Sequence, residues 1–206
     1  MDLFSANQLM WAAFIVGNSA PLLFITLYKT QKISRELFNL YFLGVLVGLT
    51  WEIPFALAGK SFHLILIDWP VDLPLVRNIT YSFIDGLIFL AGVYLAKAFL
   101  KNKQFLYNYN STALFIMILW GSFSEFLVDL NGNGKLWLFI ENWYNPVFIT
   151  INDNSLTIIP QLIWFVALIV YYFTVLNYLS NIISEIIKLA LKRGIYFRFR
   201  EVTILF

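Results

Sequence analysis

The chain has 206 residues, of which 60% are hydrophobic, 19% aromatic and only 13% charged. A soluble domain is about 45–50% apolar and about 25% charged, so this chain has too little polar surface to be covered by water. The composition therefore predicts an integral membrane protein, and the length suffices for about five membrane-spanning helices.

The residue types also exclude several kinds of chemistry. Cysteine is absent, which rules out disulfides, Cys-ligated metals and a cysteine nucleophile. The chain has one histidine, His63, which is predicted to lie in a loop without a metal role, because haem and zinc enzymes draw on several His ligands. The net charge of +2 is spread over loops and a tail, so no nucleic-acid partner is expected. No cofactor is expected either.

Taken in chain order, the apolar stretches predict an all-α bundle that forms one domain. The approximate spans are 8–28, 37–59, 79–100, 112–130 and 155–178, with a basic tail at 179–206. Lys and Arg are concentrated after the first and third spans and in the tail, which predicts an outside N-terminus and a cytoplasmic C-terminus. The expected location is the endoplasmic reticulum of a eukaryote or the plasma membrane of a prokaryote.

Ionisable and amide side chains interrupt these apolar spans. Asn18 lies in the middle of the first span, and Glu52 lies deep in the second, between Trp51 and Ile53. An acid at such a depth costs about 2.5–3.5 kcal/mol on insertion scales and indicates a functional site.

Two further acids, Asp85 and Glu125, lie in the third and fourth spans. With the predicted topology, Glu52, Asp85 and Glu125 all lie in the outer half of the membrane, at comparable depth. One of several carboxylates that share a low-dielectric cavity can stay protonated and act as a general acid. The alternative is that each acid is a structural hydrogen-bond anchor, paired with Asn18, Gln161, a serine or a Trp N–H.

Aromatic residues accompany these polar residues within the spans. Trp51 and Trp164 are two examples, and a cavity walled by aromatic rings suits a flat apolar ligand such as a sterol or an isoprenoid. The face of such a ring can also stabilise a carbocation. Ordinary packing against helices or lipid explains the same residues.

A possible calcium loop follows the fourth span. Asp129, Asn131 and Asn133 match the first half of the calcium-loop pattern, but the twelfth position is Ile140 where the pattern needs Glu. A tight Asn-Gly turn is the favoured interpretation, and calcium ligation by these three residues is the alternative.

Four short motifs lie in successive spans. They are Gly48 followed by Glu52, Asn78-Ile79-Thr80 followed by Asp85, Gly121 followed by Glu125, and Gln161 followed by Trp164.

This pattern resembles the EXPERA family of small membrane proteins, which includes sterol isomerases of the emopamil-binding-protein type and proteins of the sigma-2-receptor type. The isomerases have a His where this chain has Gly48 and an Asn where it has Gln161. The resemblance implies a five-helix bundle that shifts a ring double bond through a carbocation. It also implies that Glu52 and Asp85 transfer protons and that Trp164 stabilises the cation.

Two functions therefore remain open. One is a protein that binds a sterol or isoprenoid, with Asn18, Trp51, Gln161 and Trp164 as ligand-binding residues and Glu52, Asp85 and Glu125 as catalytic groups of a double-bond isomerase. The other is a non-catalytic accessory subunit of a larger membrane complex, in which the polar residues are structural. An ion or proton carrier is disfavoured, because no span has a continuous polar face. Membrane lipids, further copies of the chain or a larger complex are the expected partners.

Overall fold

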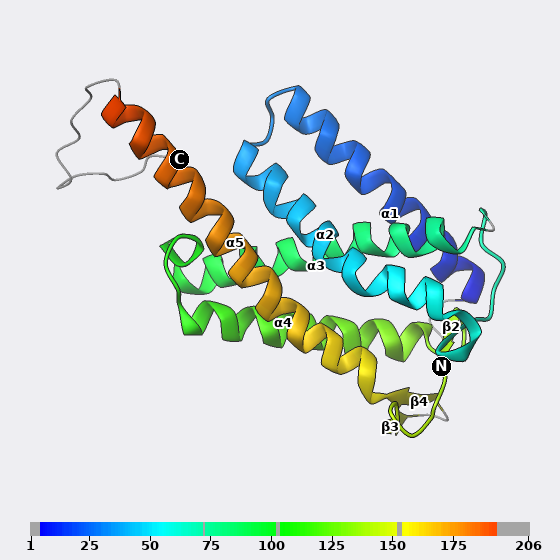
Figure 1. Cartoon of the computed structure of the whole chain (residues 1–206). Helices are drawn as coiled ribbons and strands as arrows, with labels where there is room; N and C mark the ends of the chain where they lie inside the picture. The colour runs from blue at the N-terminus through cyan, green and yellow to red at the C-terminus, as the bar shows by residue number, and fades with distance from the viewer. Residues whose placement is uncertain (1–4, 72, 102–103, 152–153, 193–206) are drawn as a thin grey trace.

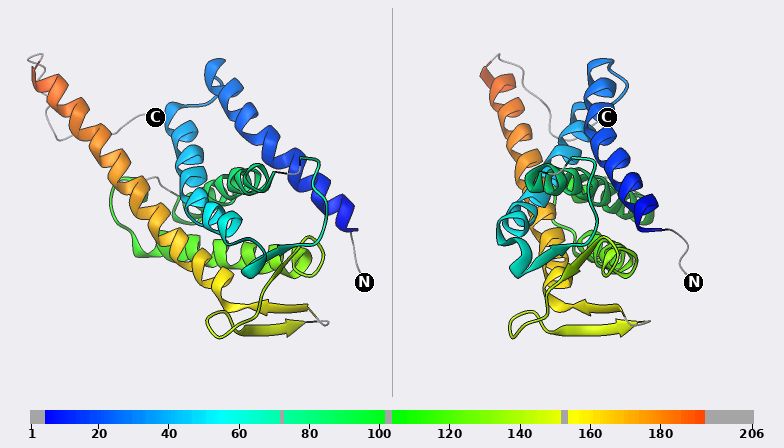
Figure 2. Two further views of the ribbon diagram at one scale, coloured as in Figure 1. Left: turned by 45° about the vertical axis from the view of Figure 1, so that its right-hand side comes forward. Right: turned by 90° about the vertical axis from the view of Figure 1, so that its right-hand side faces the viewer.

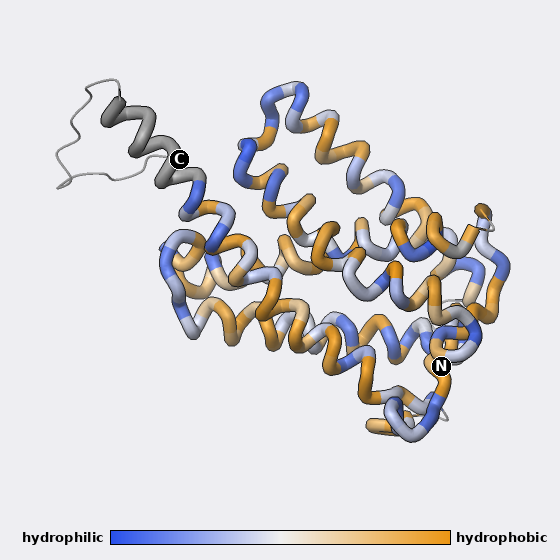
Figure 3. Tube along the Cα trace, viewed as in Figure 1, coloured by the Kyte–Doolittle hydropathy of each residue, from blue (hydrophilic) through white to orange (hydrophobic). Residues whose placement is uncertain are grey.

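The computed structural model describes residues 5–71, 73–101, 104–151 and 154–192. In this part of the chain, five helices are long and apolar enough to cross a membrane, which confirms the predicted helical, multi-pass fold. They are α1 (Ala6–Lys29), α2 (Arg35–Ala58), α3 (Pro74–Leu100), α4 (Ser111–Gly132) and α5 (Ile158–Lys192) (Figure 1). Apolar residues follow the helices, and the hydrophilic residues gather at helix ends and in loops (Figure 3). The side of the membrane that each terminus faces stays a prediction.

The helix bounds differ from the predicted spans at α3 and α5. Helix α3 begins at Pro74, ahead of the predicted residue 79, because proline is well suited to the first turn of a helix. The predicted fifth span began at residue 155, but Asn154–Thr157 form a strand. Helix α5 continues to Lys192, so the predicted tail at 179–206 begins inside a helix, and residues 193–206 lie outside the described part of the chain.

Four short strands, which were not predicted, lie in the loops at one end of the bundle. Strand β1 (His63–Ile65) pairs with β2 (Trp137–Phe139), and β3 (Val147–Ile151) pairs with β4 (Asn154–Thr157). Both pairs are antiparallel. The β3–β4 hairpin projects beyond the helices (Figure 2). We call this end of the bundle the strand end, and the pairing of β1 with β2 joins the α2–α3 loop to the α4–α5 loop there.

Helices α2 and α3 approach each other closely because glycines face one another between them. A Cβ atom at Gly86 would lie 2.7 Å from Val45 Cγ2 and 3.0 Å from the backbone oxygen of Tyr41. A Cβ atom at Gly44 would lie 3.1 Å from the Cα atom of Gly86. Small residues allow such close contact in membranes, where packing and hydrogen bonds take the place of the hydrophobic effect between helices.

A cluster of aromatic rings connects α3 and α2 to α5. Phe89 stacks on Trp164 and on Tyr171, with ring centroids 5.4 and 4.7 Å apart. The Tyr171 hydroxyl donates a hydrogen bond to the backbone oxygen of Leu40 on α2, at 3.0 Å. These contacts set the position of Trp164 relative to α2.

The glycine contact predicts a specific loss of stability. Gly86→Ala should destabilise the protein by about 1–3 kcal/mol, because the added methyl group overlaps atoms of α2 that cannot move freely. Thermal unfolding in detergent measures this loss. Gly92→Ala on the same helix is the comparison and should cost less, since its Cβ atom would lie 3.2 Å from Trp120 Cδ1, a side chain that has to shift by only a few tenths of an ångström. Equal unfolding temperatures for the two variants would contradict the proposed close contact.

Candidate active site

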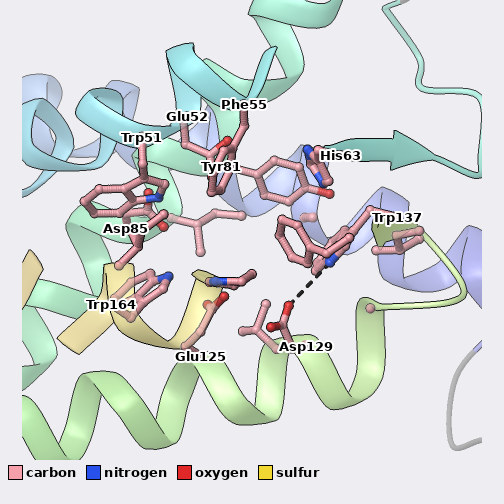
Figure 4. A pocket seen from close by; sticks show the side chains of 18 of the residues that line it. Trp51, Glu52, Phe55, His63, Tyr81, Asp85, Glu125, Asp129, Trp137 and Trp164 are labelled. Carbon is pink, nitrogen blue, oxygen red and sulfur yellow. Dashed lines mark hydrogen bonds between the residues drawn. The ribbon is translucent and has the colours of Figure 1, made fainter. Parts of the chain in front are cut away.

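A cavity of about 500 Å³ lies within the bundle, towards the strand end (Figure 4). Its volume falls in the range of about 300–1,000 Å³ that is usual for small-molecule sites. Four carboxylates from three helices line it, namely Glu52 on α2, Asp85 on α3, and Glu125 and Asp129 on α4. Six aromatic residues form much of the remaining wall: Trp51, Phe55, Tyr81, Trp137, Phe139 and Trp164.

The structure brings the three acids named from the sequence to one cavity. Glu52, Asp85 and Glu125 are each at least nine-tenths buried. The three side chains come from three different helices and line the same cavity. Because neighbouring carboxyl groups in a cavity of low polarity share their protons, this set can hold and exchange a proton.

Glu52 is held by a neighbour that the sequence analysis treated only as part of a motif. Asn78, on the first turns of α3, is fully buried and donates a hydrogen bond of 2.6 Å from Nδ2 to Glu52 Oε2. This bond fixes the orientation of the carboxylate in the cavity. It also satisfies one of the acceptor positions that the membrane interior would otherwise leave unpaired.

Asp85 lies directly against the backbone of Gly48. A Cβ atom at residue 48 would lie 2.6 Å from Asp85 Oδ2, so the carboxyl group occupies the space that a side chain there would need. Within the described residues, Asp85 Oδ2 has no hydrogen-bond partner. Gly48, which has no side chain, thus makes room for the Asp85 carboxyl group.

Glu125 and Asp129 lie one helical turn apart on α4, and they differ in their partners. Asp129 accepts hydrogen bonds from Gln161 Nε2 at 2.9 Å and from Trp137 Nε1 at 3.4 Å, the second of which Figure 4 shows. Glu125 has no hydrogen bond to any described residue and faces the cavity. Glu125 is therefore free to interact with a ligand, whereas Asp129 is held in place.

Two tryptophans lie beside the acids. The rings of Trp51 and Trp164 have centroids 5.6 Å apart, and both residues line the cavity. Their aromatic faces provide an apolar surface with negative electrostatic potential, which can stabilise a nearby cation.

Two residues that the sequence analysis assigned to ligand binding do not line the cavity. Asn18 on α1 donates hydrogen bonds to the backbone oxygen of Phe14 and to Thr80 Oγ1, so it connects α1 to α3. Gln161 affects the cavity only through its bond to Asp129. Gln161 thus pairs with an acid, as the structural alternative expected, whereas Asn18 bonds to Thr80 and to no acid.

The residues of the calcium alternative do not form the loop that it requires. Asp129 and Asn131 lie inside helix α4, and Asn133 ends that helix, so these residues form no calcium-binding loop. Asn131 donates to the backbone oxygen of Leu127, and Asn133 bonds to Asn154 and to Ser155. In the part of the chain that the structure describes, no three His, Cys, Asp or Glu side chains come together in a way that could hold a metal ion.

Asp129 therefore belongs to the cavity, which the sequence analysis missed. Its position four residues after Glu125 was the available signal, because residues at that spacing share one face of a helix.

His63 also lines the cavity, although the sequence placed it in a loop. It begins strand β1 and pairs with Phe139 of β2, on whose ring it stacks with a centroid distance of 4.8 Å. The two residues are far apart in sequence, so no local motif could reveal this contact. Burial, and secondly the positive charge of Arg77, lower the pKa of His63 from its ordinary value of 6.5 to about 3. The imidazole is therefore neutral at physiological pH.

No known protein family and no curated protein matches this sequence, and no solved structure matches the fold. The resemblance to the EXPERA family thus stays a prediction, and the geometry of the cavity carries the functional argument.

The buried His63 predicts that the protein loses stability in mild acid. Between pH 6.5 and pH 3 the unfolded chain binds a proton at this residue that the folded protein does not, so the stabilisation is complete above pH 6.5 and falls as the pH drops. The expected loss between pH 7.5 and pH 5 is about 2 kcal/mol.

Unfolding in detergent at several pH values measures this loss. His63→Phe, which keeps the ring stacked on Phe139, is the matched variant and should show a shallower decline over that interval. The same pH profile in both proteins would show that His63 does not titrate in this way.

Proposed function

We propose that this protein binds a sterol or isoprenoid lipid and isomerises a double bond in it. The observation that carries the proposal is that Asp85 and Glu125, two acids from different helices, line one largely apolar cavity, and that Asp85 Oδ2 is buried without a hydrogen-bond partner among the described residues. A cavity with apolar walls and a few convergent polar groups is the usual form of a site for an apolar ligand.

The reaction needs only proton transfer. A protonated carboxyl group adds its proton to one carbon of the double bond, which leaves a carbocation on the other carbon. A second carboxylate then removes a proton from the carbon on the far side of that cation, and the double bond forms one position along. The net change is a shifted double bond, with one proton gained and one lost by the protein and no oxidant or reductant involved.

Three of the four acids have separate roles in such a reaction. Glu52 and Asp85 come from facing helices, and Asp85 lies near the Trp51 and Trp164 end of the cavity (Figure 4). The two indole rings would stabilise the carbocation there. Glu125, as a further unpartnered acid, would return the proton to the acid that donated it. The resemblance to the EXPERA isomerases supports this assignment, because Glu52, Asp85, Glu125 and Trp164 all line the one cavity.

A non-catalytic role is the second candidate, and a specific observation favours it. Glu52 accepts a hydrogen bond from the buried Asn78, and Asp129 accepts hydrogen bonds from the buried Trp137 and the half-buried Gln161, as structural acids in a membrane bundle do. In such an accessory subunit or lipid-binding protein, the same cavity would hold a lipid without converting it.

The acids are tested by charge-neutral substitutions of nearly the same shape. Glu52→Gln and Asp85→Asn should each lower turnover of a sterol substrate by about 100-fold or more, since each removes a group that transfers a proton. Mass spectrometry of sterols incubated with the protein in lipid vesicles measures the turnover. Glu36→Gln on α2 is the control, because Glu36 lies far from the cavity and bonds to Tyr107. Unchanged turnover in both cavity variants would exclude the acids from the mechanism and leave the non-catalytic role.

Lipid binding itself is tested without knowledge of the substrate. The purified protein should carry an apolar lipid that mass spectrometry detects after gentle extraction. Ile84→Trp, which fills part of the cavity, should lower the amount of this lipid several-fold. Ile15→Trp should leave it unchanged, because Ile15 is 59% exposed and does not line the cavity. An equal lipid content in all three proteins would mean that the lipid is not held in the cavity.

A further inference from the structure

The cavity has a second polar region away from the tryptophan pair. Figure 4 shows His63 and Trp137 at one end of the cavity and Trp51 with Trp164 at the other. Tyr81 of α3 contacts the Trp137 ring edge-on, with a centroid distance of 5.5 Å, and His63 contacts the same ring at 6.3 Å. His63 and Tyr81 therefore meet at one indole, and the Tyr81 side chain points toward His63 (Figure 4).

The polar atoms of these two residues are buried and lack partners. His63 is 6% exposed, and neither of its ring nitrogens hydrogen-bonds to any described residue. The Tyr81 hydroxyl is buried as well and is likewise without a partner in the described part of the chain. Both residues line the cavity. Buried polar groups are almost always hydrogen-bonded in folded proteins, so three unpaired atoms at one place require an explanation.

Packing holds both rings in position, so the atoms are not free to turn toward other partners. The imidazole stacks on Phe139 at 4.8 Å and contacts Phe55 at 5.8 Å. The pairing of β1 with β2 fixes the backbone that carries it. The rings packed on the imidazole are thus aromatic, Arg77 is a positive charge close enough to act on it, and the residue also lines the cavity.

We infer that His63 and Tyr81 form a subsite for the hydroxyl group at one end of an otherwise apolar ligand. A neutral imidazole offers one donor and one acceptor, and a phenol hydroxyl can do either, so the pair matches an alcohol, which also donates one hydrogen bond and accepts others. The subsite deepens the proposed lipid binding and rests on it.

The position of the subsite defines the ligand further. If the alcohol oxygen of the ligand is held beside Trp137, the hydrocarbon part of the ligand extends toward Trp51 and Trp164 (Figure 4). Asp85 would then face a part of the skeleton that is remote from the oxygen. The ligand class is therefore a rigid or extended lipid alcohol whose double bond lies away from its hydroxyl group, as in a sterol, and not a hydrocarbon or a charged lipid.

A pair of sterols that differ in one oxygen tests this inference. Cholesterol and cholest-5-ene share a skeleton, and only cholesterol has the hydroxyl group. Binding of each to the full chain in detergent should favour cholesterol by about 10-fold or more, because a site built for a hydroxyl group rejects the analogue that leaves its polar atoms unpaired.

Variants show whether this preference comes from the subsite. Tyr81→Phe and His63→Phe, which keep the rings, should each weaken cholesterol binding by about 10-fold and leave cholest-5-ene binding unchanged. Tyr41→Phe is the control, since its buried hydroxyl bonds to the backbone oxygen of Phe83 and does not line the cavity.

The outcomes separate the two proposals. Equal binding of the two sterols to the wild-type protein, or a preference that both variants retain, would overturn the subsite and leave the lipid-binding function intact. Binding of neither sterol would overturn the sterol-binding function and the subsite together. A preference that is lost in Tyr81→Phe and kept in Tyr41→Phe supports the subsite.

Discussion

The close approach of α2 and α3 is the constraint on which the rest of the site depends. Gly44 and Gly86 let the two backbones meet, and Gly48 leaves room for the Asp85 carboxyl group. A bilayer interior has no water to satisfy a displaced carboxylate, so the acid must find its place within the protein. The short distance between the helices also allows Asn78 to reach Glu52 across the interface. The packing of the membrane bundle and the chemistry of the cavity are thus consequences of the same three glycines.

The four cavity acids have two kinds of surroundings. Glu52 and Asp129 accept hydrogen bonds that fix them, whereas Asp85 Oδ2 and the Glu125 carboxylate are unpartnered among the described residues. A proton-transfer site needs both kinds, because reactive groups must be positioned by neighbours that do not move. A purely structural set of acids would have no reason to leave two of its members unpaired in a medium where that is costly. This difference among the acids is what favours a functional cavity.

The sequence predicted the helices and three of the acids, because both depend on local properties. A run of about twenty apolar residues predicts a membrane-spanning helix, and an acid inside such a run is recognised from the sequence alone. The strands and the position of His63 depend on pairing between residues 63 and 139, which no local pattern records. Asn18 was expected to bind a ligand, but it bonds to Thr80 of α3. The sequence does not distinguish an amide that faces a ligand from one that bonds to a neighbouring helix. Asp129 was considered as a calcium ligand and not as a cavity residue, because a calcium-loop pattern and the end of a helix contain the same residue types.

The hydrogen bonds of the acids also have a consequence for how the chain is made. Glu52 bonds to Asn78 of the next helix, and Asp129 bonds to Trp137 and Gln161, which follow it closely in sequence. The α2–α3 hairpin can therefore satisfy Glu52 before α4 and α5 have been synthesised, and the α4–α5 hairpin satisfies Asp129 when the last helix enters the bilayer. The β1–β2 pair cannot form until residue 139 has been synthesised, so the cavity is closed late. Biosynthesis in this order would pair Glu52 and Asp129 as their hairpins form and complete the cavity only once α5 is in place.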